Sequence, residues 1–154
     1  MKQANLLGLT KSDYCIFCKI SRKEEQAYIV YEDEHFISFL DNRPLFPGHC
    51  LLIPKTHVEN FHVLRQNQVG SLFQLAQIIS KSVERAMNAN GTFVAVNNKV
   101  SQSVPHLHVH ISPRRYKDGL KGFFWPRNPY QSAEHMNQVQ KAIRENINLL
   151  LAKN

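Results

Sequence analysis

The sequence predicts an α+β fold: an antiparallel sheet of about five strands with one long helix and a C-terminal helix. Three observations support this fold. Five short apolar runs are bounded by turn residues, residues 66–89 have helical periodicity, and several connections are too short for the crossover helices that parallel strands need. A length of 154 residues, without repeats or linker-like stretches, indicates a single domain over 1–154.

The first strands are predicted after a polar lead of residues 1–13. Tyr28–Tyr31 and Phe36–Leu40 flank an acidic turn and are typical of a β-hairpin. A loop rich in turn-forming residues precedes a third strand over 49–53. This strand ends at Pro54, because proline has no N–H to donate to a sheet.

The second half begins with the long helix. Its apolar residues recur at spacings of three and four, and Asn90-Gly91 supplies a stop. Strands are predicted over 92–96 and 106–111. Ser132 can cap a last helix over 131–152.

Composition narrows the class of protein. No apolar run is long enough to cross a membrane, and three cysteines are a poor basis for a secreted disulfide framework, so we expect a cytoplasmic protein. The net charge of +7 favours anionic ligands. The basic residues are dispersed, however, and the sequence contains no dense Lys/Arg block, which makes nucleic acid an unlikely partner.

The strand over 106–111 carries three alternating histidines. His106, His108 and His110 are expected on one face, as an edge-exposed polar row, and the apolar residues between them on the core face. An imidazole can act as nucleophile, proton relay or metal ligand. A metal site made by all three histidines is the alternative to catalysis.

The residues His-Leu-His-Val-His-Ile-Ser at 106–112, preceded by Gln-Ser-Val at 102–104, resemble the motif of the histidine triad (HIT) family. Similar segments occur in the family's order at 39–41, at 47–57 and in the strand leading to Asn97. The resemblance covers residues 15–126. It implies the family's fold, a nucleotide as the small-molecule partner, and a symmetric homodimer.

The resemblance also implies a covalent nucleotidyl-histidine intermediate. His108 would be the nucleophile that attacks the α-phosphate, and His110 would contact the phosphate. Ser103 and Gln102 would bind phosphate oxygens or the leaving group, although two polar residues at this place can equally form a turn.

Further nucleotide contacts are implied at Asp41, for the ribose hydroxyls, and at Asn97, for phosphate or ribose. Either residue can instead simply end a strand. Trp125 would line a base or leaving-group pocket. The loop 98–101 departs from the family pattern because it contains no glycine, which alters how closely the backbone can approach a phosphate.

Cys15 and Cys18 have the spacing of a zinc knuckle. By resemblance, His57 and His106 would complete a structural zinc site, and no organic cofactor is expected. A redox dithiol is the alternative, but the βαβ setting typical of one is not predicted here. His49 is a candidate to extend the hydrogen bonds of the triad. No functional role is predicted for three other histidines: His35, His62 and His135.

The leading hypothesis is therefore a nucleotidyl hydrolase or transferase. Its substrate would be a purine nucleoside phosphoramidate, a dinucleoside polyphosphate or a similar conjugate. The alternatives are a nucleotide-binding regulatory protein with little catalysis, and an enzyme that removes adenylyl groups from nucleic-acid ends. The sequence does not select the base or the leaving group.

Overall fold

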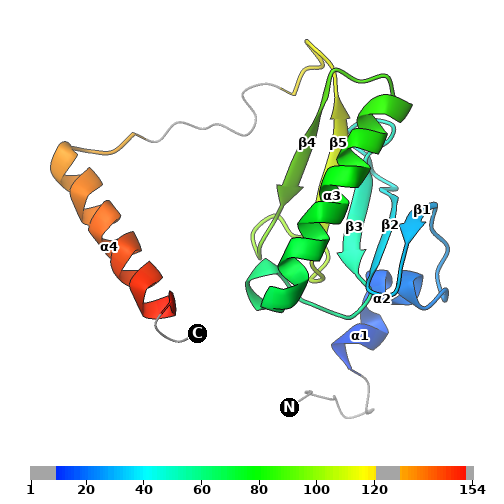
Figure 1. Ribbon diagram of the computed structural model, residues 1–154, viewed down its shortest axis with the longest axis horizontal. Helices are drawn as coiled ribbons and strands as arrows, with labels where there is room; N and C mark the ends of the chain where they lie inside the picture. Colours follow the sequence, from blue (N-terminus) through cyan, green and yellow to red (C-terminus); the bar gives the residue numbers. More distant parts are fainter. Residues whose placement is uncertain (1–9, 121–128, 152–154) are drawn as a thin grey trace. The chain divides into compact units, whose positions relative to one another are not determined.

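The α+β architecture is confirmed in a computed structural model that describes residues 10–120 and 129–151 (Figure 1). The chain divides into two compact units, Met1–Asp118 and Gly119–Asn154. The first unit contains three α-helices, one 3-10 helix and five strands, in this order: α1 Lys11–Tyr14, α2 Ile16–Ser21, β1 Ile29–Glu32, β2 Phe36–Leu40, β3 Cys50–Pro54, η1 Phe61–Val63, α3 Gln66–Ala86, β4 Gly91–Val96 and β5 Val109–Arg114.

The five strands form one sheet in the order β1-β2-β3-β5-β4, and every neighbouring pair is antiparallel. The predicted sheet is thus confirmed. Because β5 lies between β3 and β4, the predicted position of the histidine row at an exposed edge is wrong. The row is covered: the exposed fractions of His106 and His108 are 0% and 3%.

Each face of the sheet has its own apolar core. On one face, α3 packs against side chains that include Leu52, Leu107 and Val109, and Figure 1 shows this helix crossing the sheet. On the other face, Phe17 from α2 packs with Ile37. The alternation of side chains along each strand therefore assigns neighbouring residues to different cores.

The histidine strand begins later than predicted. Pairing with β3 stops at Val109, opposite Leu52, and β5 starts there rather than at His106. Leu107 instead donates its N–H to the carbonyl of Val58, at 2.6 Å. Residues 106–108 therefore have no strand pairing with β3 and are bound instead to the segment after β3. An alternating strand pattern does not reveal such a contact.

The long helix α3 ends at Ala86, earlier than predicted. Asn88 adopts a φ of 46°, a left-handed conformation that asparagine tolerates and that ends a helix. Gly91 belongs to β4 instead. The guanidinium of Arg115 donates to the carbonyls of Met87 and Asn88, which satisfies groups that the helix leaves unpaired.

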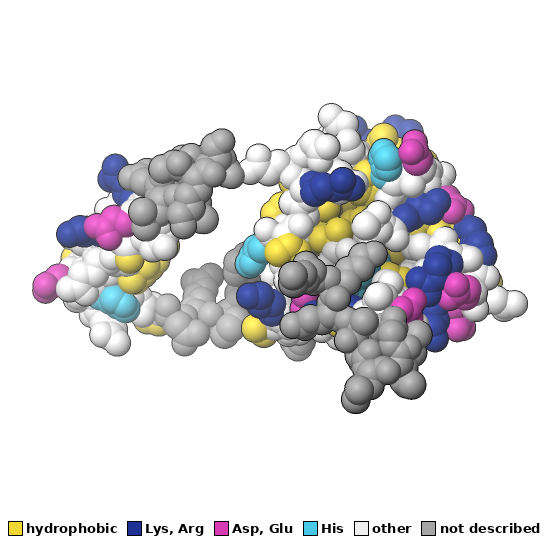
Figure 2. All heavy atoms as spheres, turned by 90° about the horizontal axis from the view of Figure 1, so that it is seen from below, with side chains coloured by type: hydrophobic (Ala, Val, Ile, Leu, Met, Phe, Trp, Pro, Cys, Tyr) yellow, Lys and Arg dark blue, Asp and Glu magenta, His cyan; other side chains and the backbone are white. Residues whose placement is uncertain are grey.

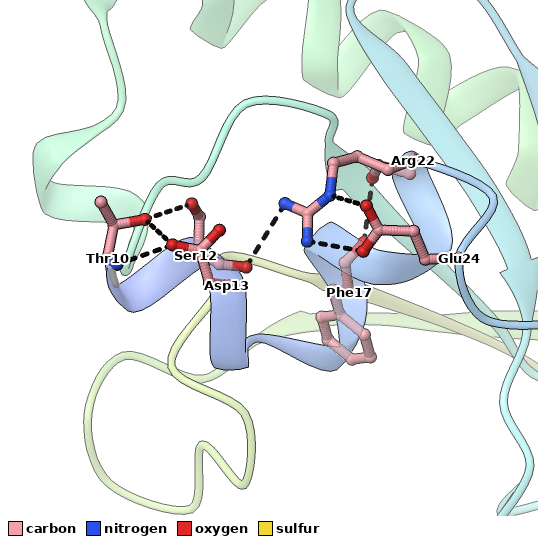
Figure 3. Close-up of polar contacts among 7 residues, drawn as sticks. Thr10, Ser12, Asp13, Phe17, Arg22 and Glu24 are labelled. Atoms are coloured by element: carbon pink, nitrogen blue, oxygen red, sulfur yellow. Dashed lines mark hydrogen bonds and ion pairs between the residues drawn. The ribbon is translucent and has the colours of Figure 1, made fainter. Parts of the chain in front are cut away.

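Two short helices lie where only a polar lead and a cysteine pair were predicted. Thr10 begins α1 with a capping box, in which Asp13 accepts from the backbone N–H of Thr10 at 2.6 Å (Figure 3). The Thr-x-x-Asp spacing was the available signal. After α2, Arg22 forms a two-pronged ion pair with Glu24, at 2.7 and 2.8 Å.

The second unit contains α4 (Ala133–Leu151), close to the predicted bounds of 131–152. Ser132 caps it as predicted, since its hydroxyl accepts from the N–H of His135 at 3.0 Å. Trp125 lies outside the described residues, so its predicted role stays a prediction. Among the described residues, no helix is both long and apolar enough to span a membrane.

Candidate active site and metal centre

The structure brings the four predicted metal ligands together. Cys15 is the N-cap residue of α2, Cys18 lies in its first turn, His57 follows β3, and His106 precedes β5. Their ligand atoms all lie within 4.8 Å of one another. The Nδ1 atom of His106 is 3.4 Å from Sγ of Cys15 and 3.5 Å from Sγ of Cys18. The Nδ1 atom of His57 is 3.3 Å from Sγ of Cys18.

These separations fit a tetrahedral ion. With usual zinc–sulfur and zinc–nitrogen bond lengths, sulfur and nitrogen ligands of one ion are separated by about 3.5 Å. The ring of His106 is oriented for the same task. Its Nε2 donates to the carbonyl of Pro54 at 2.8 Å, which leaves the lone pair of Nδ1 facing the two sulfurs.

The protonation of the cluster also favours a cation. Burial, assisted by the neighbouring Cys15, raises the pKa of the Cys18 thiol to about 12. Two thiolates therefore need a compensating positive charge at this place. Burial lowers the pKa of His106 to about 4, so the ring is neutral and able to ligate. The cysteine pair begins a helix, but no strand lies directly before it as in a thioredoxin-like dithiol.

His108 is buried next to this cluster. Its Nδ1 lies 2.7 Å from the carbonyl oxygen of His106. A carbonyl can only accept, so Nδ1 carries the proton of the neutral ring and Nε2 keeps a lone pair. The rings of Phe17 and His110 contact the His108 ring edge-on, with centroids 5.3 and 4.8 Å away. The Nε2 lone pair is the group that can attack an electrophile.

His110 is joined to His49, the histidine expected to extend the triad. The Nε2 atom of His49 and the Nδ1 atom of His110 are 3.1 Å apart. The backbone N–H of Leu45 donates to Nδ1 of His49 at 3.1 Å, so Nδ1 is an acceptor and Nε2 of His49 is the donor. His110 then accepts at Nδ1 and carries its own proton on Nε2. The row thus places an acceptor nitrogen on His108 beside a donor nitrogen on His110.

Asp41 lies at the outer end of these bonds. One of its carboxylate oxygens accepts from the N–H of Arg43 at 2.9 Å, and the other is 3.6 Å from Nδ1 of His49. The closer backbone donor of Leu45 decides the protonation of His49. Asp41, His49 and His110 also lie close enough together to share a cation, but the hydrogen bonds account for this proximity.

Burial keeps both histidines neutral. It lowers the pKa of His49, and Asp41 opposes this shift only in part. It lowers the pKa of His110 to about 4, with further lowering from His108 and His49. The proton order described above therefore holds near neutral pH.

The loop that holds His49 is fixed by a glycine. Gly48 has a φ of 94°, which side chains with a Cβ rarely adopt. A Cβ at this position would also lie 2.6 Å from Cγ of Met87. The positive φ favours glycine immediately before His49, and the Met87 side chain, just after α3, occupies the space beside it.

The loop before the histidine row adopts a glycine-like backbone without glycine. Lys99 and Ser101 have φ angles of 68° and 58°. The Gln102 amide joins this loop to the segment between β3 and η1: its Oε1 accepts from the N–H of Lys99 at 2.8 Å and its Nε2 donates to the carbonyl of Glu59 at 2.7 Å. Ser103 is exposed. Both polar groups of the Gln102 amide are therefore bound by the backbone, one in its own loop and one at Glu59.

The remaining predicted residues vary in their relation to the site. Asn97 is half-buried and donates to the carbonyl of Ser101 at 3.3 Å, within the same loop. His35 and His62 are exposed, and neither belongs to the two histidine clusters. His135 accepts from the N–H of Gln131, at the start of α4.

Surface charge is mixed. Figure 2 shows basic and acidic side chains interspersed on the visible face. Lys23 and Lys55 both pair with Glu32, and Lys11 lies 3.4 Å from Glu59. This distribution agrees with the dispersed basic residues of the sequence.

Comparison with known proteins identifies the family. The HIT domain matches residues 22–117. A HIT-like protein of Saccharolobus solfataricus is 38% identical over 136 residues, which cover 86% of this chain and 97% of that protein. An adenylylsulfatase of Arabidopsis thaliana is 34% identical over 113 residues, 72% of this chain and 57% of that protein.

A solved structure agrees. The crystal structure of a zinc-bound histidine triad family protein from Mycobacterium smegmatis is 29% identical, with a TM-score of 0.64, covering 90% of this chain and 99% of that chain. The five-stranded sheet, the histidine row and these similarities lead to one conclusion. The chain belongs to the HIT family.

Proposed function

We propose that this protein is a nucleotide hydrolase or transferase that cleaves at the α-phosphate through a covalent nucleotidyl-His108 intermediate. The observation that carries the proposal is the bond from Nδ1 of His108 to the carbonyl of His106, at 2.7 Å. It leaves the Nε2 lone pair as the nucleophile without a separate base to remove a proton.

The reaction has two displacements. The Nε2 lone pair of His108 forms a bond to the α-phosphorus, and the bond to the leaving group breaks with its electron pair. The leaving group takes up a proton from solvent. Water then attacks the same phosphorus, releases a proton and breaks the P–Nε2 bond, which restores the lone pair. A second nucleophile in place of water gives transfer.

The neighbouring histidine, His110, is proposed to bind the phosphate. The Nε2–H of His110 is the donor for a phosphate oxygen on which charge develops. His49 fixes that proton by its bond at 3.1 Å, and it acts as a positioning residue rather than a catalytic one. We assign the ribose hydroxyls to Asp41, and the phosphate or leaving group to Ser103. Gln102 takes part only if it exchanges its bonds within the loop.

The substrate class is a purine nucleoside phosphoramidate, a dinucleoside polyphosphate or a related conjugate. One relative is an adenylylsulfatase, so adenylyl sulfate belongs in the same substrate panel. These compounds share a labile bond at the α-phosphorus, which is the atom that the proposed nucleophile attacks.

We also propose that the Cys/His cluster holds a structural zinc ion, bound by Cys15, Cys18, His57 and His106. The sulfur–nitrogen distances in the cluster fit a tetrahedral ion, and the neutral ring of His106 turns its Nδ1 lone pair toward the two sulfurs. Zinc supplies folding energy at such sites.

We also propose that the active form is a homodimer, which light scattering of the purified protein would measure.

The test is a substrate panel assayed with wild type, His108→Ala and His62→Ala. His62 is an exposed histidine outside the clusters and serves as the matched control. We expect a loss of turnover of about a thousandfold or more for His108→Ala, on the scale of removing a covalent nucleophile. Intact-mass spectrometry of quenched wild type should show a nucleotidyl adduct. A His108→Ala protein with near-normal turnover contradicts the proposal.

A further inference from the structure

The metal cluster and the proposed nucleophile are connected through one residue. The ring of His106 belongs to the cluster, with Nδ1 facing the sulfurs and Nε2 bound to Pro54. The carbonyl of the same residue accepts the proton of His108. Both ring nitrogens of His106 are thus engaged, and its side chain is fully buried. One residue therefore supplies both a ligand to the cluster and the carbonyl that orients His108, so a displacement of the His106 backbone moves both.

A second connection runs through Phe17. This residue lies between the two cysteines in sequence, and its ring contacts three others: His108 at 5.3 Å, His106 at 5.9 Å and Phe39 at 5.5 Å between centroids. Its exposed fraction is 7%. Figure 3 shows the ring pointing away from the exposed Arg22–Glu24 ion pair. Phe17 and Cys18 are neighbours in α2, and Cys15 is the N-cap residue of the same helix, so a displacement of this segment moves the ring together with the two cysteines.

The contacts around His108 show what these connections control. The carbonyl of His106 fixes Nδ1, and the rings of Phe17 and His110 contact its ring edge-on. Two of these three contacts come from the segments that carry metal ligands. The Leu107 N–H, bound to Val58 at 2.6 Å, ties the backbone between the two histidines to the segment after His57.

We infer that the metal cluster is a positioning device for the nucleophile, and that Phe17 is the positioning residue that transmits its state to His108. The inference deepens the proposed function and rests on it. With the cluster loaded, His106 and Phe17 hold His108 in the tautomer with a free Nε2 lone pair. With the cluster empty, His108 samples other orientations while the core against α3 persists.

The test compares four proteins: wild type, His57→Ala, Phe17→Leu and Phe73→Leu. His57 is a ligand whose ring contacts His106. Phe73 lies on α3, contacts Phe61 and has an exposed fraction of 41%, so it is the matched Phe→Leu control. The readouts are metal content, the ¹⁵N and Nδ1–H signals of His108 at one fixed pH, and the single-turnover rate with adenosine 5′-phosphoramidate.

We expect His57→Ala to lose metal and the defined Nδ1–H signal of His108, with a fall in rate of about a hundredfold and little change in KM, the cost of misplacing a reactive group by about 1 Å. Phe17→Leu should keep its metal, and its single-turnover rate should also fall. Phe73→Leu should match wild type. If His57→Ala does not fold, Phe17→Leu and chelator-treated wild type decide the question.

The inference is overturned if metal-depleted protein, or Phe17→Leu, keeps both the Nδ1–H signal and the single-turnover rate. Failure of the proposed function looks different. In that case wild type forms no adduct at His108 with any nucleotide of the panel, while the NMR signals still report whether the metal and Phe17 orient the ring.

Discussion

His49 and His110 are bonded ring to ring, with Nε2 of the first 3.1 Å from Nδ1 of the second. The N–H of Leu45 fixes the direction of this bond, because it occupies the only acceptor nitrogen of His49. A backbone amide in a loop therefore sets which nitrogen of His110 carries a proton. In the proposed mechanism, the proton that His110 donates to the phosphate is thus fixed by a backbone amide two hydrogen bonds away.

Replacing His49 tests this chain of bonds. We expect His49→Leu to lower kcat about tenfold to a hundredfold, because outer partners that fix a functional histidine have effects of this size. His49→Gln should retain more activity, since its amide can accept from Leu45 and donate to His110. The measurement is steady-state kinetics of both variants. Equal activity of His49→Leu and wild type contradicts the role of His49.

Much of the site could be predicted because short sequence patterns indicate it. The alternation over 106–110 places three histidines on one face whether or not a ladder forms, and the spacing of Cys15 and Cys18 indicates a metal knuckle. Both signals depend only on covalent geometry. The family resemblance added His57, which the structure brings to the cluster.

The rest depended on long-range contacts. The strand order places β5 inside the sheet, and no pattern within the strand reveals its neighbours. The backbone of residues 106–108 is bound to Val58, through the N–H of Leu107, rather than to a neighbouring strand of the sheet. The bonds of Gln102 to Lys99 and Glu59 depend on how two loops meet, which is why its amide lies within the loop rather than free for a phosphate.

The zinc content of cysteine variants tests which cysteines bind the metal. We expect about one zinc ion per chain in wild type, and a loss of most of it in Cys18→Ala, because this sulfur lies 3.3 Å from His57 and 3.5 Å from His106. Cys50 is equally buried but lies outside the cluster, so Cys50→Ala is the matched control and should keep its metal. Elemental analysis after purification without chelators checks this. Less than about a tenth of an equivalent in wild type removes the zinc proposal.

Ser38 offers a test of the core. Its hydroxyl is fully buried in β2 and has no hydrogen-bond partner among the described residues. An unsatisfied buried hydroxyl costs about 1–3 kcal/mol, so Ser38→Ala should raise the free energy of unfolding by about 1 kcal/mol.

Ser80 is the matched control, because its hydroxyl lies 2.6 Å from that of Thr92. Ser80→Ala should lower the free energy of unfolding by about 1 kcal/mol. Urea denaturation of the two variants measures both effects. A destabilised Ser38→Ala protein indicates that the hydroxyl has a partner after all.

The neutral state of His110 predicts how stability depends on pH. Burial, mainly, lowers its pKa from the usual 6.5 to about 4 in the folded protein. Between these values the unfolded chain binds a proton that the folded chain does not. The contribution of His110 to stability is therefore complete above pH 6.5 and is lost as the pH falls toward 4.

His110→Asn removes this titration, so its free energy of unfolding should fall less steeply between pH 6.5 and 4 than that of wild type. The metal ligands also titrate in acid, but both proteins carry them, so the difference between the two curves reports the titration of His110 and of its partner His49. His62→Asn changes an exposed histidine and should follow wild type. Parallel curves for wild type and His110→Asn would show that folding does not lower the pKa of His110, which would contradict the conclusion that burial keeps this ring neutral in mild acid.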